Sequence, residues 1–162
     1  MKRFRFVASL VLAVVFATGL TGPALAGDLV PFKGRLAGDV SHTPDPPFDF
    51  VEVDATGHAS HLGKFRLVIP HLVDTSTRTA VGSYAFTAAN GDMLFADFTG
   101  VATPTATPGV VLIVESATIT GGTGRFADAT GSFVVERLFD RVADTTSGSF
   151  QGRISSPGAG QR

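Results

Sequence analysis

The sequence has 162 residues and no cysteine, and its 13 Lys and Arg nearly balance its 14 Asp and Glu. This length suits one domain with a single core, and the lack of cysteine excludes a small scaffold held together by disulfides. The basic residues beyond position 26 stand singly along the chain. The sequence therefore predicts neither a basic surface nor a nucleic-acid partner.

The first 26 residues have the pattern of a secretory signal peptide. Basic residues near the N-terminus precede an apolar run over residues 6–20, and Ala24-Leu25-Ala26 supplies small residues for cleavage after Ala26. The run is short for a membrane span of about 20 residues, so we predict a cleaved signal and no membrane span in the mature chain. Export to the periplasm or the medium without disulfides favours a bacterial source.

Beyond the signal, apolar and polar residues alternate with period two, and turn residues recur about every 10 residues. We predict eight strands, over residues 29–38, 48–55, 59–73, 80–89, 93–102, 110–120, 131–140 and 145–155. Gly82, Gly148 and Gly152 lie on the apolar face of their strands, as the sharp coiling of a small barrel requires, which favours a barrel over a sandwich. The predicted fold is all-β, a single eight-stranded antiparallel β-barrel over residues 27–155, with a disordered tail over residues 156–162.

Two connections carry specific expectations. Asn90-Gly91 between alternating runs predicts a hairpin with a type I′ turn, because both residues accept a positive φ. The segment 42–47 contains three prolines, which remove donors from a strand ladder. We therefore predict a loop at the rim of the barrel for this segment.

The glycine-rich stretch TITGGTGRFADATGSF, residues 118–133, resembles a dinucleotide-binding fingerprint at Gly122, Gly124 and Ala127. Such a site needs a helix after the glycines so that its N-terminus faces the pyrophosphate. Here strand periodicity resumes after about one turn, so a hairpin loop is the better interpretation. Phe126 in this loop is a candidate to close one end of the barrel.

The same stretch resembles a segment of dirigent proteins, GGTGKF-x-x-A-x-G, at residues 121–126 together with Ala129 and Gly131. Dirigent proteins share an eight-stranded, calycin-type barrel with allene oxide cyclase, and this chain is similar to bacterial exported proteins of that type. The resemblance implies the barrel fold and a structural role for the loop glycines Gly121, Gly122, Gly124 and Gly131. The plant relatives guide phenoxy-radical coupling or cyclise an epoxide, but the motif places none of their pocket residues on this chain.

Two charged residues fall on apolar strand faces. Glu115 is in phase with its apolar neighbours in one strand, and Arg137 is in phase with Phe133, Val135 and Phe139. A hairpin symmetric about Phe126 would place the two opposite each other inside the barrel, where a charged pair must be bonded. The alternative is a bulge near Glu136-Arg137 that turns one or both outward.

His71 and Tyr84 are also in phase with apolar residues and are predicted to face inward, His71 as a core histidine or a ligand contact. His58 and His61 are three apart, which on a strand means opposite faces. Because no cysteine or carboxylate cluster accompanies them, we predict no metal site.

The sequence favours a non-catalytic protein that binds a small apolar ligand in the barrel or serves as a stable scaffold. The candidate ligand-binding residues are Glu115, Arg137, His71 and Tyr84, and no catalytic residue, nucleophile motif or cofactor is predicted. Two alternatives stay open. One is an enzyme of the allene oxide cyclase or dirigent type that guides a cyclisation or coupling, and the other is a structural or surface protein with a filled core; a homo-oligomer is compatible with each.

Overall fold

The computed structural model describes residues 28–155 and residue 157. The predicted signal peptide and all of the predicted tail except Pro157 lie outside the described residues. Within the described part, no helix is long and apolar enough to cross a membrane.

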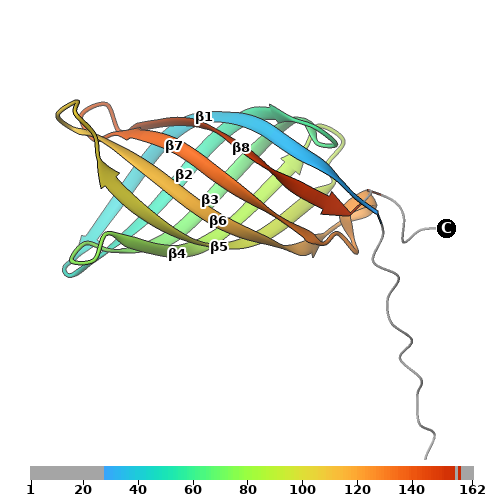
Figure 1. Ribbon diagram of the computed structural model, residues 1–162, viewed down its shortest axis with the longest axis horizontal. Helices are drawn as coiled ribbons and strands as arrows, with labels where there is room; N and C mark the ends of the chain where they lie inside the picture. Colours follow the sequence, from blue (N-terminus) through green and yellow to red (C-terminus); the bar gives the residue numbers. More distant parts are fainter. Residues whose placement is uncertain (1–27, 156, 158–162) are drawn as a thin grey trace, which may run out of the picture.

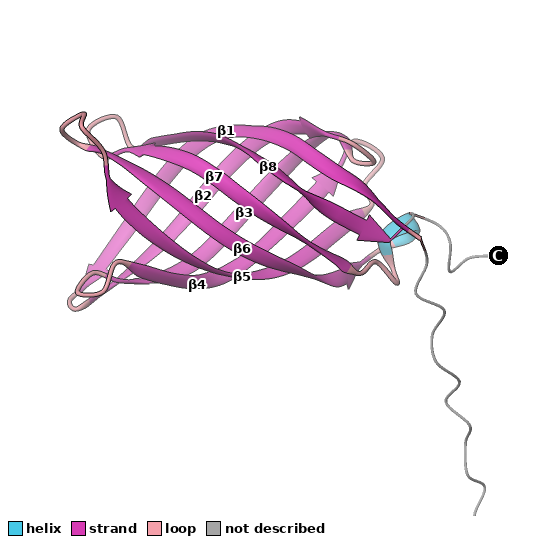
Figure 2. Ribbon diagram, in the orientation of Figure 1, coloured by secondary structure: helices cyan, strands magenta, loops and turns pink. Residues whose placement is uncertain are grey.

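Eight antiparallel strands form one closed barrel, as predicted (Figure 1). Each strand pairs with its neighbours in sequence, and the last pairs with the first. The secondary structure apart from turns is all strand except one short 3-10 helix, η1, at one end of the barrel (Figure 2). The strands are β1 (Leu29–Asp45), β2 (Phe48–Ala59), β3 (Gly63–Asp74), β4 (Thr79–Ala88), β5 (Met93–Pro104), β6 (Val110–Gly122), β7 (Gly131–Asp140) and β8 (Thr145–Ser155).

The rim loop predicted for residues 42–47 is wrong for its first four residues. Strand β1 continues to Asp45, where it pairs with Phe48, and only Pro46 and Pro47 form the connection. Beyond Asp39, β1 pairs with β2 but no longer with β8. This part of β1 is an edge, so a proline that cannot donate a hydrogen bond is tolerated there.

Two turns also differ from prediction. Residues 60–62 form the turn between β2 and β3, so the third strand begins at Gly63 and His61 leaves the strand with φ 66°. The hairpin at Asn90-Gly91 exists, but only Gly91 has a positive φ. Gly91 N–H donates to the carbonyl of Ala88, the pattern of a type I turn followed by a left-handed glycine.

The glycine-rich loop closes the end of the barrel at which β1 begins and β8 ends. Helix η1 (Gly124–Phe126) has three residues and only residues 127–130 separate it from β7, so this loop lacks the long helix that a dinucleotide site requires. Phe126 is fully buried and closes this end. Gly124 has φ 54°, and a Cβ there would meet the carboxylate of Asp92, so this corner favours glycine.

Next to this plug, aromatic rings fill the closed half of the barrel. Phe32 and Phe86 meet edge to face with centroids 6.3 Å apart, and Phe65 contacts Phe86 in the same way at 5.2 Å. Phe133 and Phe150 complete the cluster. Such edge-to-face contacts add to the burial of large apolar surfaces, so this half is a packed core.

Candidate functional site

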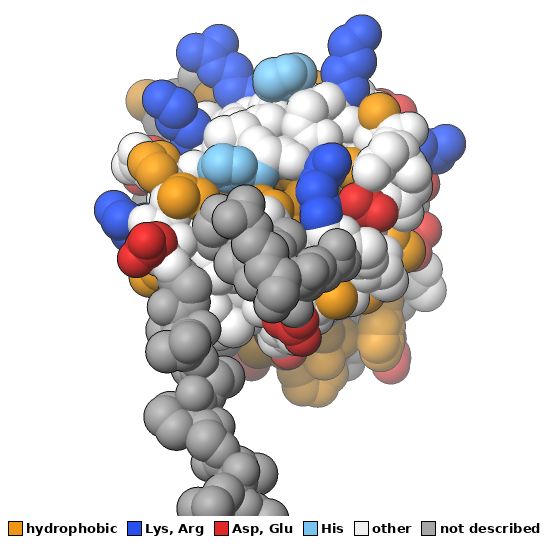
Figure 3. Space-filling model, turned by 90° about the vertical axis from the view of Figure 1, so that its right-hand side faces the viewer, with side chains coloured by type: hydrophobic (Ala, Val, Ile, Leu, Met, Phe, Trp, Pro, Cys, Tyr) orange, Lys and Arg blue, Asp and Glu red, His pale blue; other side chains and the backbone are white. Residues whose placement is uncertain are grey.

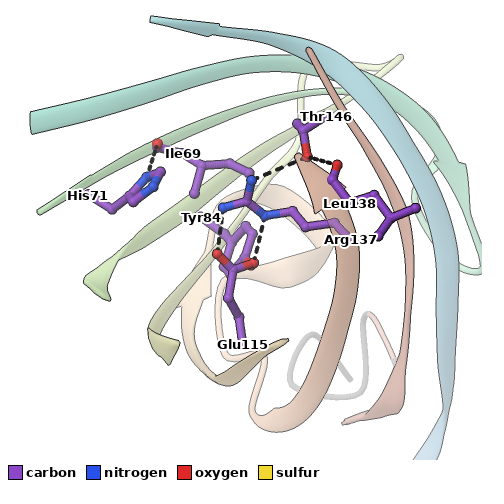
Figure 4. Close-up of polar contacts among 7 residues, drawn as sticks. All are labelled: Ile69, His71, Tyr84, Glu115, Arg137, Leu138 and Thr146. Carbon is purple, nitrogen blue, oxygen red and sulfur yellow. Dashed lines mark hydrogen bonds and ion pairs between the residues drawn. The ribbon is translucent and has the colours of Figure 1, made fainter. Parts of the chain in front are cut away.

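Glu115 and Arg137 form an ion pair inside the barrel (Figure 4). Arg137 Nη2 lies 2.7 Å from Glu115 Oε1, and Arg137 Nε lies 3.0 Å from Glu115 Oε2. Both side chains are buried, with exposed fractions of 0% and 2% for Glu115 and Arg137. The predicted pair therefore exists, and the alternative of an outward-turning bulge is wrong.

The register of the pair differs from prediction. Glu115 lies opposite Val135, and Arg137 lies opposite Ile113, so the two charged residues are diagonal neighbours on β6 and β7. The β6–β7 hairpin is centred on Arg125, one residue earlier than the symmetric hairpin that we predicted, because Ile119 pairs with Gly131. A shift of the centre by one residue moves each partner by two positions, which keeps both side chains on the inner face.

Tyr84 and Thr146 complete a hydrogen-bonded network around the pair. The Tyr84 hydroxyl donates to Glu115 Oε2. Arg137 Nη1 donates to Thr146 Oγ1 at 3.3 Å, and that hydroxyl donates in turn to the Leu138 carbonyl at 2.8 Å. Thr146 lies on the inner face of β8. The sequence did not single out this residue, because threonine is abundant along the chain.

Burial and the charge of Glu115 set the ionisation of this network. Burial raises the pKa of Tyr84 well above its usual 10.0, and the negative charge of Glu115 raises it further. Burial acts to lower the pKa of Arg137, but hydrogen bonds and attraction from Glu115 outweigh it and the net shift is upward. Tyr84 therefore stays protonated and Arg137 stays charged at neutral pH, so neither is free to exchange a proton.

His71 lies on β3 with its ring held by the backbone. Its Nδ1 contacts the Ile69 carbonyl at 2.9 Å, and because a carbonyl only accepts, Nδ1 carries the proton. Burial lowers the pKa of His71 from 6.5, and the positive charge of Arg137 also lowers it. The ring is therefore neutral at neutral pH, and its Nε2 makes no hydrogen bond to any residue within the described part of the chain.

A cavity of about 500 Å³ occupies the half of the barrel opposite the plug. Arg137 and His71 both line it, whereas Glu115 and Tyr84 lie beneath Arg137 and outside its lining. Seven of its fifteen lining residues are apolar and eight are polar or charged, so the cavity combines apolar surface with polar groups, as small-molecule sites do. The apolar wall consists of Val40, Val51, Val73, Ala102, Val111, Ile113 and Phe139.

The rim of the cavity carries residues that sequence reasoning missed. His42 Nδ1 lies 2.8 Å from Asp49 Oδ2, and the His42 ring packs on Phe139 with centroids 5.4 Å apart. Arg78 and Arg141 also line the cavity. The His42–Asp49 pair was missed because residues 42–47 were predicted to form a loop. A prediction with only Pro46-Pro47 as the connection would have placed His42 and Asp49 on adjacent strands.

The remaining histidines stand apart from the cavity. His58 is exposed on β2, and His61 in the following turn contacts the Pro31 carbonyl through Nε2 at 3.1 Å. Across residues 28–155, no group of three or more His, Cys, Asp or Glu could hold a metal ion.

The chain thus forms a closed eight-stranded barrel that is packed at one end and contains a cavity at the other. No protein-family model matches the sequence, and comparison with curated proteins gives no match. Among solved structures, the barrel is similar to the pterocarpan synthase dirigent protein GePTS1, with a TM-score of 0.54 and 14% identity over 81% of this chain and 92% of that chain. The dirigent-like fold expected from the glycine-rich loop is thus confirmed.

Proposed function

We propose that this protein binds a small, largely apolar ligand in the open half of its barrel and does so without catalysis. The observation that carries the proposal is the cavity, whose apolar wall ends on two polar side chains, Arg137 and His71. The walls would bury the body of the ligand, and the bare Nε2 of His71 would accept a hydrogen bond from a hydroxyl or amide on it.

The chemistry of the interior favours binding over catalysis. Tyr84 and Arg137 both donate hydrogen bonds to the Glu115 carboxylate, and the shifts in their pKa values oppose proton transfer near neutral pH. A general acid or base works best when its pKa lies near the operating pH. The filled-core alternative describes only the closed half, since the open half contains the cavity.

A fluorescent apolar probe, N-phenyl-1-naphthylamine, tests the binding site. Ala102→Phe would fill the cavity, whereas Val101→Phe places the same ring on the outer wall, where Val101 is 51% exposed. We expect probe fluorescence to rise with the wild-type protein and with Val101→Phe, and the affinity to fall at least tenfold with Ala102→Phe. Equal affinities for all three would contradict the proposal.

Guidance of a cyclisation or coupling is the second candidate, supported by the similarity to a pterocarpan synthase dirigent protein. In that case the cavity would orient a reactive intermediate and supply little chemistry of its own. A phenol oxidised by a one-electron oxidant in the presence of the protein would give products with an enantiomeric excess. A racemic product, unchanged from the reaction without protein, would contradict this candidate.

We also propose that the chain is exported, because residues 1–26 have the three parts of a signal peptide. Expression of the full chain in a bacterial host, followed by mass spectrometry of the exported fraction, tests this. A mature N-terminus at Gly27 is expected, and a full-length chain retained in the cytoplasm would contradict it.

A further inference from the structure

The barrel gathers basic residues that are widely separated in the sequence onto one part of its outer wall. They lie on β8, β1 and β3, near the closed end. We call this surface the cationic wall; it comprises Lys33, Arg35, Lys64, Arg66 and Arg153. The sequence predicted no basic surface, because these residues stand singly along the chain and only strand pairing brings them together.

The register brings basic side chains of β1 and β3 to either side of His58 on β2. Arg35 lies directly opposite His58, and His58 lies directly opposite Lys64, so a row crosses three strands from β1 to β3. Directly opposed side chains on one face have Cβ atoms about 5 Å apart. In the view onto the closed end, Lys and Arg side chains and two histidines are spread over the upper half of the molecule, with Asp and Glu side chains between and below them (Figure 3).

All five residues of the cationic wall are exposed, and none takes part in an ion pair within the described residues. Arg153 donates one hydrogen bond to the Leu29 carbonyl and is otherwise open. The outward-facing neighbours on β8, such as Ser149 and Gln151, are uncharged. The wall therefore presents an excess of positive charge to solvent. The exposed carboxylates of Glu136, two strands from Arg35, and of Asp54, diagonal to Arg66, balance only part of it.

Two carboxylates of the same strands lie together beside this wall. Asp39 lies directly opposite Asp54 on the β1–β2 pair, four residues along from the Arg35–His58 position. Like charges directly opposite each other destabilise a sheet, whereas alternating them would give favourable pairs. Positive and negative side chains are thus grouped rather than alternated along these strands.

We infer that the cationic wall binds a linear acidic polysaccharide, whose carboxylate or sulfate groups repeat along the chain. Lys33 and Arg35 lie about 7 Å apart along β1, Lys64 and Arg66 lie about 7 Å apart along β3, and the two strands are about 10 Å apart on either side of β2. This spread matches a series of anionic groups rather than one deep pocket. Among these side chains the single aromatic ring is that of His58 on β2, whereas single-stranded nucleic acid stacks successive bases on several rings, so the surface fits a polysaccharide better. This site lies outside the cavity and is independent of the ligand proposed above.

A pair of charge-reversal variants with the same net charge tests the inference. Arg35→Glu/Lys64→Glu changes the cationic wall, and the matched control Arg78→Glu/Arg141→Glu makes the same change at the cavity mouth. Binding to polygalacturonate and to dextran sulfate is measured by biolayer interferometry over a series of salt concentrations, with uncharged dextran as the blank. Circular dichroism first establishes that both variants are folded.

We expect the wild-type protein and the mouth variant to bind at least one polyanion with similar affinity that falls as salt rises, and the wall variant to lose at least tenfold. The preferred polymer distinguishes a carboxylated from a sulfated partner. Three results would overturn the inference: no binding to either polymer, equal losses in the two variants, or stronger binding to phosphatidylglycerol vesicles or to an oligonucleotide than to both polymers.

Discussion

Gly100 lies directly opposite Glu115 on the neighbouring strand, and its missing side chain makes room for the buried carboxylate. A Cβ at Gly100 would be 2.8 Å from Glu115 Cγ. Two polar side chains that line the cavity have the same arrangement, since Gly82 lies opposite His71 and Gly148 lies opposite Arg137. Glycine opposite a long polar side chain is thus a repeated device of this barrel interior.

Gly100→Ala should therefore destabilise the protein by about 1–3 kcal/mol, because the new methyl group forces Glu115 out of its bonded position. Urea unfolding followed by circular dichroism measures this. Thr99→Ala on the outer face of the same strand is the control and should change stability little. A Gly100→Ala protein as stable as this control would mean that the interior accommodates the methyl group.

The Glu115–Arg137 ion pair should show strong coupling in a double-mutant cycle. Glu115→Leu and Arg137→Met should each cost about 3–5 kcal/mol, because either change leaves the remaining charge buried without its partner. The double variant should cost much less than the sum of the two. Additive losses in the free energy of unfolding would show that the two side chains do not depend on each other.

Tyr84 should remain un-ionised in the folded protein well above pH 10. It is the only tyrosine and the chain has no tryptophan, so absorbance near 295 nm reports this one residue. The folded pKa is raised, so the unfolded state loses its proton first, and stability falls as the pH rises above the unfolded pKa of about 10. Ionisation should thus appear only together with unfolding, and a separate titration of the native protein near pH 10 would contradict this.

His71 should make the protein less stable at mildly acidic pH. Its folded pKa lies below 6.5, so the unfolded state takes up a proton first, and stability is lost as the pH falls from about 6.5 through the folded pKa. His71→Asn should remove this part of the dependence. Urea unfolding at pH 7.5 and pH 5.5 tests it, and an unchanged difference between the two pH values in the variant would assign the dependence to other groups.

The sequence by itself determined the local structure, because strand periodicity and turn residues are local signals. It predicted the number of strands, the hairpin made by residues 118–133, and the inward phase of Glu115, Arg137, His71 and Tyr84. The loop predicted at Pro44 was wrong, because β1 continues through this residue. A strand tolerates proline there since β1 extends beyond the end of β8 and has no partner on that side.

The tertiary structure decided what only register and closure can fix. A shift of the hairpin centre to Arg125 made Glu115 and Arg137 diagonal rather than opposite partners. Pairing across β1, β2 and β3 assembled the cationic wall from residues far apart in the sequence, and closure of the barrel left one half packed with aromatic rings and the other hollow. These features depend on contacts between distant strands, which the alternation of residues within one strand does not encode.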